Sequence, residues 1–236
     1  MNPINITQRR IESQYELAAV TWMAYNEAIQ GCKIVMDIGA NIGGMFLSFI
    51  GNGVNKVHAF EPVPIAYDKM IANYGRDTRL IPSRVAMSDK PGRITGATVY
   101  NAWTLLPKGE YRIDVAAEFK DLPTFDFELT TVDLYCSLSD IKPDFLKIDV
   151  DGYEFRVLKG AVNTLAKYRP PMLFELSYLP SLIGDNCEEL CKFIFELGYV
   201  VVTMDCKVVV RNWLDLIERF PWRSSFDVML MPKERI

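Results

Sequence analysis

Short, nearly continuous apolar runs alternate with helix-forming segments along most of this chain. Runs of strand length occupy residues 33–38, 56–60, 79–87, 145–150, 172–176, 199–204 and 224–232. Helices are predicted at residues 43–50, 64–74, 154–168 and 187–197, the second of them opening at Pro64. This alternation predicts a mostly parallel sheet with helices on both faces, and burial of both faces explains why runs such as IVMDI hold few polar residues.

The length of 236 residues, 50% of them hydrophobic, suits one compact domain. Residues 1–30 are expected to form an N-terminal helical extension, because Ile11, Tyr15 and Trp22 follow a near-helical spacing. Residues 31–236 then form a single domain. Residues 88–139 are less regular and hold turn signals. Within them, residues 92–129, together with the N-terminal helix, are expected to determine which molecule the protein accepts.

The overall composition excludes several classes of partner. A net charge of −4 gives no global basic field, so nucleic acid is an unlikely partner. No apolar run approaches the roughly 20 residues of a membrane span, and the N-terminus lacks the apolar core of a signal peptide, so we expect a cytoplasmic protein. The five cysteines have irregular spacing and no neighbouring histidine, which indicates reduced thiols rather than a zinc or disulfide framework.

The turn after the first predicted strand reads DIGANIGG, residues 37–44. Ligands of such sheets bind beyond the carboxyl ends of the strands, so this turn is a candidate cofactor site. A dinucleotide fingerprint needs glycine where Asn41 stands, and the Asp37 carboxylate would repel a pyrophosphate. The acid suits S-adenosylmethionine (AdoMet), which presents an ammonium, a sulfonium and two ribose hydroxyls. A plain, closely packed strand-to-helix turn is the structural alternative.

Glu61 closes the second predicted strand, in KVHAFEP. A carboxylate at this point can accept both hydroxyls of a ribose, and NAD-binding proteins share the feature, so Glu61 alone does not separate the two cofactors. Its structural alternative is a solvated strand end. The combination of Glu61 with Asp37 and Asn41 favours AdoMet.

Several further segments then stand in a familiar order: VMDIGANIGG, VHAFEPVPIAYDKM, RVAMSDKPG, TTVDLY, PDFLKIDVDGYEFRVLKGA and MLFEL. In this order they resemble the FkbM-like methyltransferases, from about Lys33 to Ser177. The resemblance implies an AdoMet-dependent enzyme with a class I methyltransferase (Rossmann-like) fold, a seven-stranded sheet whose last strand is antiparallel. It also implies methylation of hydroxyl oxygens, often on sugars. Asp151 departs from the family pattern, in which glutamate is more usual.

The resemblance also implies cofactor-binding roles. The turn would wrap the methionine and ribose of AdoMet, Glu61 with Pro62 would bind the ribose diol, and Asp149 would face the methyl donor. Ala86 and Ser88, which follow the third strand, would lie near the adenine, with a simple turn as the alternative for Ser88. The implied turn residues are Asp37, Gly39, Ala40, Asn41 and Gly43.

Asp149, Asp151 and Glu175 are the predicted catalytic residues, since transfer to a hydroxyl benefits from a general base. Their oxygens could instead hold Mg²⁺, and the sequence does not choose between these roles. Asp151 and Glu154 also resemble a capping box, which is a purely structural alternative. Lys147 is expected either to pair with one of these acids or to extend outward. His58, the only histidine, is predicted to pack within the sheet.

The function predicted from these residues is transfer of a methyl group from AdoMet to a hydroxyl of a sugar, glycan or glycosylated small molecule, leaving S-adenosylhomocysteine. An NAD-dependent oxidoreductase and a non-catalytic scaffold with the same fold are the alternatives. A homodimer is a further possibility that the sequence does not test. The acceptor is otherwise open.

Overall fold

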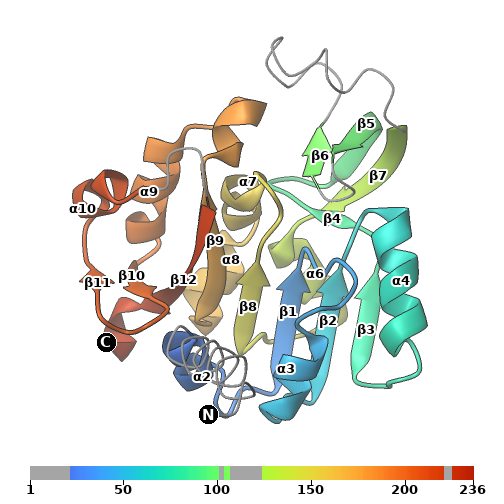
Figure 1. Cartoon of the computed structure of the whole chain (residues 1–236), viewed down its shortest axis with the longest axis horizontal. Helices are drawn as coiled ribbons and strands as arrows, with labels where there is room; N and C mark the ends of the chain where they lie inside the picture. The colour runs from blue at the N-terminus through green and yellow to red at the C-terminus, as the bar shows by residue number, and fades with distance from the viewer. Residues whose placement is uncertain (1–21, 101–103, 107–123, 221–224) are drawn as a thin grey trace, which may run out of the picture.

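The computed structural model describes residues 22–100, 104–106, 124–220 and 225–236. Its main feature is an eight-stranded sheet in the order β11-β10-β12-β9-β8-β1-β2-β3 (Figure 1). The strands are β1 (Ile34–Ile38), β2 (Lys56–Phe60), β3 (Leu80–Ser83), β8 (Phe145–Ile148), β9 (Met172–Ser177), β10 (Tyr199–Thr203), β11 (Val209–Val210) and β12 (Ser225–Pro232).

The sheet is parallel from β3 to β9, and β12, the last strand of the chain, runs antiparallel to both of its neighbours. The predicted mostly parallel sheet with an antiparallel last strand is therefore confirmed. The predicted count of seven is one too low, because the short edge strand β11 pairs with β10. The single strand predicted over residues 79–87 is also wrong, since it divides into β3 and a second short strand, β4 (Ala86–Met87), in another sheet.

Helices cover both faces of the large sheet, as predicted. Side chains alternate along β1, so that Met36 and Ile38 face one core while Val35 faces the other. The first core is closed by α6 (Val132–Ser139), α7 (Glu154–Lys159), α8 (Val162–Tyr168), α9 (Cys187–Glu196) and α10 (Trp213–Glu218). The second is closed by α2 (Met23–Ala28), α3 (Phe46–Gly51) and α4 (Pro64–Tyr74).

Helix α2 is the described part of the predicted N-terminal extension, and residues 1–21 lie outside the described residues. Tyr25 on α2 is 2% exposed, packs edge-on against the ring of Phe145, and shares a hydrogen bond with the Ser48 hydroxyl. This part of the extension is therefore integral to the second core.

The irregular middle of the sequence forms a second, four-stranded sheet in the order β4-β7-β5-β6. It contains β5 (Gly92–Tyr100), β6 (Thr104–Leu106) and β7 (Thr124–Thr130). Figure 1 shows it at the end of the large sheet toward which β1, β2 and β8 point. Ala97 and Phe127 pack with Val63 and Tyr153, which joins the small sheet to the loops that follow β2 and β8.

No described helix is both long enough and apolar enough to cross a membrane.

Candidate active site

A cavity of about 370 Å³ opens at the carboxyl ends of β1, β2 and β8. Its walls are the turn after β1, Glu61 and Pro62 after β2, the loop after β8, and apolar side chains of the small sheet, including Ile94 and Leu129. This is the edge at which a parallel sheet binds its ligands, because the strand ends leave a crevice between diverging loops.

Gly39 sets the shape of the turn after β1. Its φ of +80° lies in the left-handed region, and a Cβ atom there would stand 1.8 Å from the carbonyl oxygen of Asp149. The backbone N–H groups of Gly39 and Ala40 both donate to the carbonyl of Phe60 at 3.0 Å. Only glycine therefore lets the turn approach β8 this closely.

The other turn residues fall into two groups. Gly39, Ala40 and Asn41 line the cavity, whereas Asp37 and Gly43 do not. Gly43 instead makes room for the ring of Tyr74, which would stand 2.8 Å from a Cβ at this position. Its predicted contact with the cofactor stays a prediction.

Glu61 links the turn to the cavity wall. Its carboxylate accepts one hydrogen bond from the N–H of Asn41 and one from the N–H of Val63, both at 2.8 Å. Burial raises the pKa of Glu61 to about 7, although these two N–H groups oppose the rise. Each oxygen keeps a second lone pair, so the carboxylate can still accept two hydroxyl donors.

Lys147 is buried at the centre of the site. Its ammonium donates to the carbonyl oxygen of Gly39 at 2.6 Å and lies 3.1 Å from Asp149 Oδ2 and 3.6 Å from Asp37 Oδ1. Burial by itself would lower the pKa of Lys147, but the two carboxylates outweigh it and raise the pKa. Of the two predicted roles for Lys147, pairing with an acid is confirmed.

Asp37 is the buried partner of this ion pair. The residue is 1% exposed, and burial raises its pKa against the opposing charge of Lys147. Asp37 Oδ1 has no hydrogen-bond partner among the described residues. It therefore supports the turn from below the cavity and depends on Lys147 for compensation of its charge.

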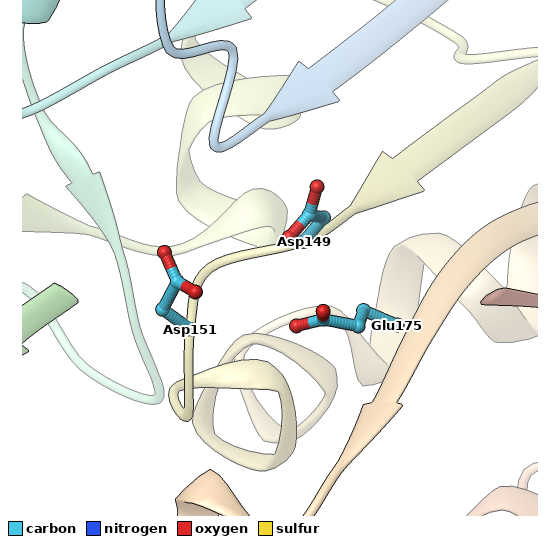
Figure 2. A group of neighbouring side chains, drawn as sticks. All are labelled: Asp149, Asp151 and Glu175. Atoms are coloured by element: carbon cyan, nitrogen blue, oxygen red, sulfur yellow. The ribbon is translucent and has the colours of Figure 1, made fainter. Parts of the chain in front are cut away.

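The three predicted catalytic acids lie together (Figure 2). One carboxylate oxygen from each of Asp149, Asp151 and Glu175 lies within 4.8 Å of the others. Asp149 and Asp151 follow β8 and line the cavity, while Glu175 comes from β9 and does not line it. The oxygen set is of the kind that binds Mg²⁺, and acidic groups also lie this close without a metal.

The environment of Asp151 and Glu175 favours protonation. Burial and the charge of Asp149 raise the pKa of Asp151 to about 6 and that of Glu175 to about 7. A carboxylate with a pKa near neutrality can accept and release a proton under ordinary conditions.

Glu154 has a structural role, but the capping box suggested for Asp151 and Glu154 is wrong, because α7 has no side-chain cap. The fully buried carboxylate accepts hydrogen bonds from the N–H groups of Val150 and Gly152 at about 3.0 Å, which fixes the loop after β8. Burial and the charge of Glu175 raise its pKa to about 8.

Asp227 was not predicted from the sequence. It lies on β12, directly opposite Glu175 in the antiparallel pair, and its side chain is exposed at the sheet edge. Partial desolvation by its neighbours and the charge of Asp149 raise its pKa. The signal available in the sequence was an acid inside an otherwise apolar final strand. That Asp227 lies opposite Glu175 could not be predicted without the order of the strands.

Two more predictions concern neighbouring residues. Ala86 lines the cavity, but Ser88 does not, because its carbonyl packs against Gly160 and its hydroxyl donates to Asp89. The role of Ser88 near the adenine remains a prediction. His58 is buried and shares a hydrogen bond with the Tyr135 hydroxyl at 2.9 Å, so its predicted packing in the sheet is confirmed.

Several known proteins similar to this chain are named as methyltransferases. A hexuronic acid methyltransferase, AglP of Haloferax volcanii, is 29% identical over 133 residues, which is 56% of this chain and 51% of the relative. The chain thus spans about half the length of this curated relative. Methyltransferase FkbM of Methylobacillus flagellatus is 17% identical, with 72% of this chain and 39% of that structure covered at a TM-score of 0.48. A TehB-like methyltransferase of Corynebacterium glutamicum is 11% identical, with coverage of 98% and 100% and a TM-score of 0.46.

The family profile described as the methyltransferase FkbM domain matches residues 37–201, from the buried acid of β1 to the middle of β10. That range holds the turn after β1, Glu61 and the loop after β8, which line the cavity, and Glu175 beside them. The chain belongs to the FkbM methyltransferase domain family.

Proposed function

We propose that this protein transfers a methyl group from AdoMet to a hydroxyl of a sugar, glycan or glycosylated small molecule. The observation that carries the proposal is the pairing across one cavity of Glu61 on one wall with Asp149 and Asp151 on the other. Glu61 suits a ribose diol, and the two aspartates stand where an acceptor hydroxyl would be oriented.

The residues present fit AdoMet better than a dinucleotide. A pyrophosphate needs N–H donors and cations. The cavity is instead lined by the carboxylates of Glu61, Asp149 and Asp151. Lys147, the cation among the described lining residues, already contacts Gly39, Asp149 and Asp37. The ammonium and the two ribose hydroxyls of AdoMet are hydrogen-bond donors, and these carboxylates can accept from them.

The chemistry assigns distinct roles to the two aspartates. When bound, AdoMet supplies a sulfonium methyl that is open to attack by an oxygen nucleophile. Asp151, with its raised pKa, accepts the proton that the acceptor hydroxyl loses as the new O–CH₃ bond forms. Asp149, paired with Lys147, orients the hydroxyl and keeps the turn fixed against β8.

The name of the relative in Haloferax volcanii, a hexuronic acid methyltransferase, supports a sugar as the class of acceptor and leaves the charge of that sugar open. Mg²⁺ held by Asp149, Asp151 and Glu175 would lower the hydroxyl pKa and is a secondary proposal. Transfer measured with and without a chelator separates the metal-assisted route from the direct one.

Isothermal titration calorimetry with AdoMet, S-adenosylhomocysteine and NADH tests the proposal. The expected result is binding of the first two, no binding of NADH, and loss of AdoMet binding in Glu61→Ala. Glu196→Ala, which changes an exposed acid on α9, is the matched control. A folded parent that binds NADH, or one that binds no AdoMet, would overturn the proposal.

A further inference from the structure

A row of acidic side chains continues from the cavity across the ends of β8, β9 and β12. Asp149 follows β8, Glu175 lies near the end of β9, and Asp227 lies opposite Glu175 in the register of β12. Figure 2 shows Asp149 just past the end of β8, Asp151 on the loop that follows, and Glu175 extending toward them from β9. We call Asp149, Asp151, Glu175 and Asp227 the acidic edge.

Buried polar atoms beside the acidic edge have no partner among the described residues. Glu175 Oε2 is one of them. Ser177 is another: the residue is 1% exposed, and its hydroxyl oxygen makes no hydrogen bond within the described chain. Because side chains alternate along a strand, Ser177 projects from the same face of β9 as Glu175. Buried polar groups are normally paired, so these atoms indicate that a polar ligand completes this side of the site.

Among the described residues that line the cavity, few cations balance the acidic edge. Of the described residues that line the cavity, Lys147 is the cation, and its ammonium is already shared by a carbonyl oxygen and two carboxylates. Juxtaposed like charges disfavour a partner strongly, whereas a neutral or positive partner meets no such opposition. An anionic ligand would therefore be repelled from this side of the cavity.

We infer that the acidic edge selects the methyl acceptor by charge: it accepts a sugar without a carboxylate, prefers one that bears an ammonium, and excludes uronic acids. The inference rests on the proposed function, since it concerns the acceptor of the same site. Glu175 and Asp227 act as specificity-determining residues, and their oxygens accept hydrogen bonds from hydroxyl or ammonium groups of the acceptor.

Three matched acceptors test this inference: a methyl glucoside, a methyl glucosaminide and a methyl glucuronide, which differ in charge on one ring. Binding to protein saturated with S-adenosylhomocysteine is measured first, and then release of S-adenosylhomocysteine during turnover with AdoMet. We expect kcat/KM to fall in the order glucosaminide, glucoside, glucuronide, with about tenfold or more between first and last.

Asp227→Asn tests the assignment to the acidic edge. We expect Asp227→Asn to reduce the ratio of kcat/KM for the glucosaminide to kcat/KM for the glucuronide to about threefold. Asp68→Asn, which changes an exposed acid on α4, is the control and should leave this ratio unchanged. Denaturation midpoints show whether each variant is folded. The order of acceptors in the parent protein is decisive even if Asp227→Asn fails to fold.

The outcomes separate this inference from the function beneath it. If the folded protein binds no AdoMet, both the proposed function and this inference are wrong. Protein that binds AdoMet but prefers the glucuronide, treats the three alike, or binds none of them overturns the inference and leaves the cofactor assignment standing.

Discussion

The ammonium of Lys147 donates a 2.6 Å hydrogen bond to the main-chain carbonyl oxygen of Gly39. One side chain of β8 thereby holds the turn that follows β1, and the same ammonium compensates the carboxylates of Asp37 and Asp149. Lys147 therefore couples the turn to two carboxylates, the buried Asp37 and the proposed catalytic residue Asp149.

Lys147→Met should destabilise the protein strongly. Removing the cation leaves the buried Asp37 carboxylate uncompensated, and breaking a buried pair in this way costs about 3–5 kcal/mol. Urea denaturation at neutral pH measures the change. Lys207→Met, which removes an exposed pair with Asp205, should have little effect on stability, because solvent screens exposed pairs. Equal effects of the two substitutions would contradict the compensating role of Lys147.

Gly39→Ala should abolish AdoMet binding and destabilise the turn. The new Cβ would collide with the carbonyl of Asp149 at 1.8 Å, so the turn must move away from β8. Gly53→Ala is the matched control, since Gly53 has a similar φ of +83° but nothing within 4 Å of its Cβ position. That substitution should cost only the backbone strain of about 1–2 kcal/mol. Calorimetry with AdoMet and urea denaturation of both variants measure these effects. Binding of AdoMet by Gly39→Ala with the affinity of the parent would contradict the role assigned to Gly39.

The stability of the ligand-free protein should fall as pH rises from about 5 to 8. Glu154 has a folded pKa of about 8, above its unfolded value of 4.5, so the folded state retains a proton that the unfolded state releases. The stability from this group is complete below pH 4.5 and is lost as pH rises toward 8. Its share of the slope is up to about 1.4 kcal/mol per pH unit.

Glu154→Gln is the variant that checks this slope, because it keeps an acceptor oxygen for Val150 and Gly152 but cannot ionise. Urea denaturation at pH 5, 6, 7 and 8 should give a flatter dependence in the variant than in the parent. Parallel curves for the two proteins would mean that Glu154 does not retain its proton on folding.

Asp151→Asn should lower turnover by about 10²- to 10⁴-fold, the usual contribution of a general base. AdoMet affinity should change by less than about threefold. In the parent, kcat should rise with pH through about 6, because the ionised form of Asp151 accepts the proton. The variant should lack this rise. A variant that keeps both the rise and the parental turnover would exclude Asp151 as the base.

Asp149→Asn should also reduce turnover far more than it weakens AdoMet binding, which calorimetry and single-turnover measurements together would establish. The amide can still accept a hydrogen bond from Lys147, so the turn should keep its place. A proportional loss of binding and turnover would instead mean that Asp149 serves only the cofactor.

Much of the fold was predictable because burial on both faces leaves a direct mark on composition. The apolar runs of β1, β2, β8, β9 and β10 were each located to within two residues. Short or exposed elements left no such mark. The two-residue strands β4 and β11, and the small sheet that contains β4, depend on pairing partners distant in the sequence.

In the candidate site, too, some features were predictable from the sequence and others depend on contacts between distant residues. The spacing of Asp37, Gly39 and Glu61 marked the cavity in advance, because residues that follow strands must meet at one edge of a parallel sheet. The contact of Lys147 with Gly39 was not foreseen, since it spans 108 residues and depends on the register of β1 with β8.

The sequence by itself determined the parallel sheet, the turn and the acids that follow the strands, because periodicity and spacing are local properties of the chain. Only the tertiary structure decided which acids are compensated and which are not. The pairing of β12 with β9 places Asp227 opposite Glu175, and the pairing of β1 with β8 places Lys147 beside Asp37. Charge compensation depends on distances between strands, and those are fixed only when the sheet assembles.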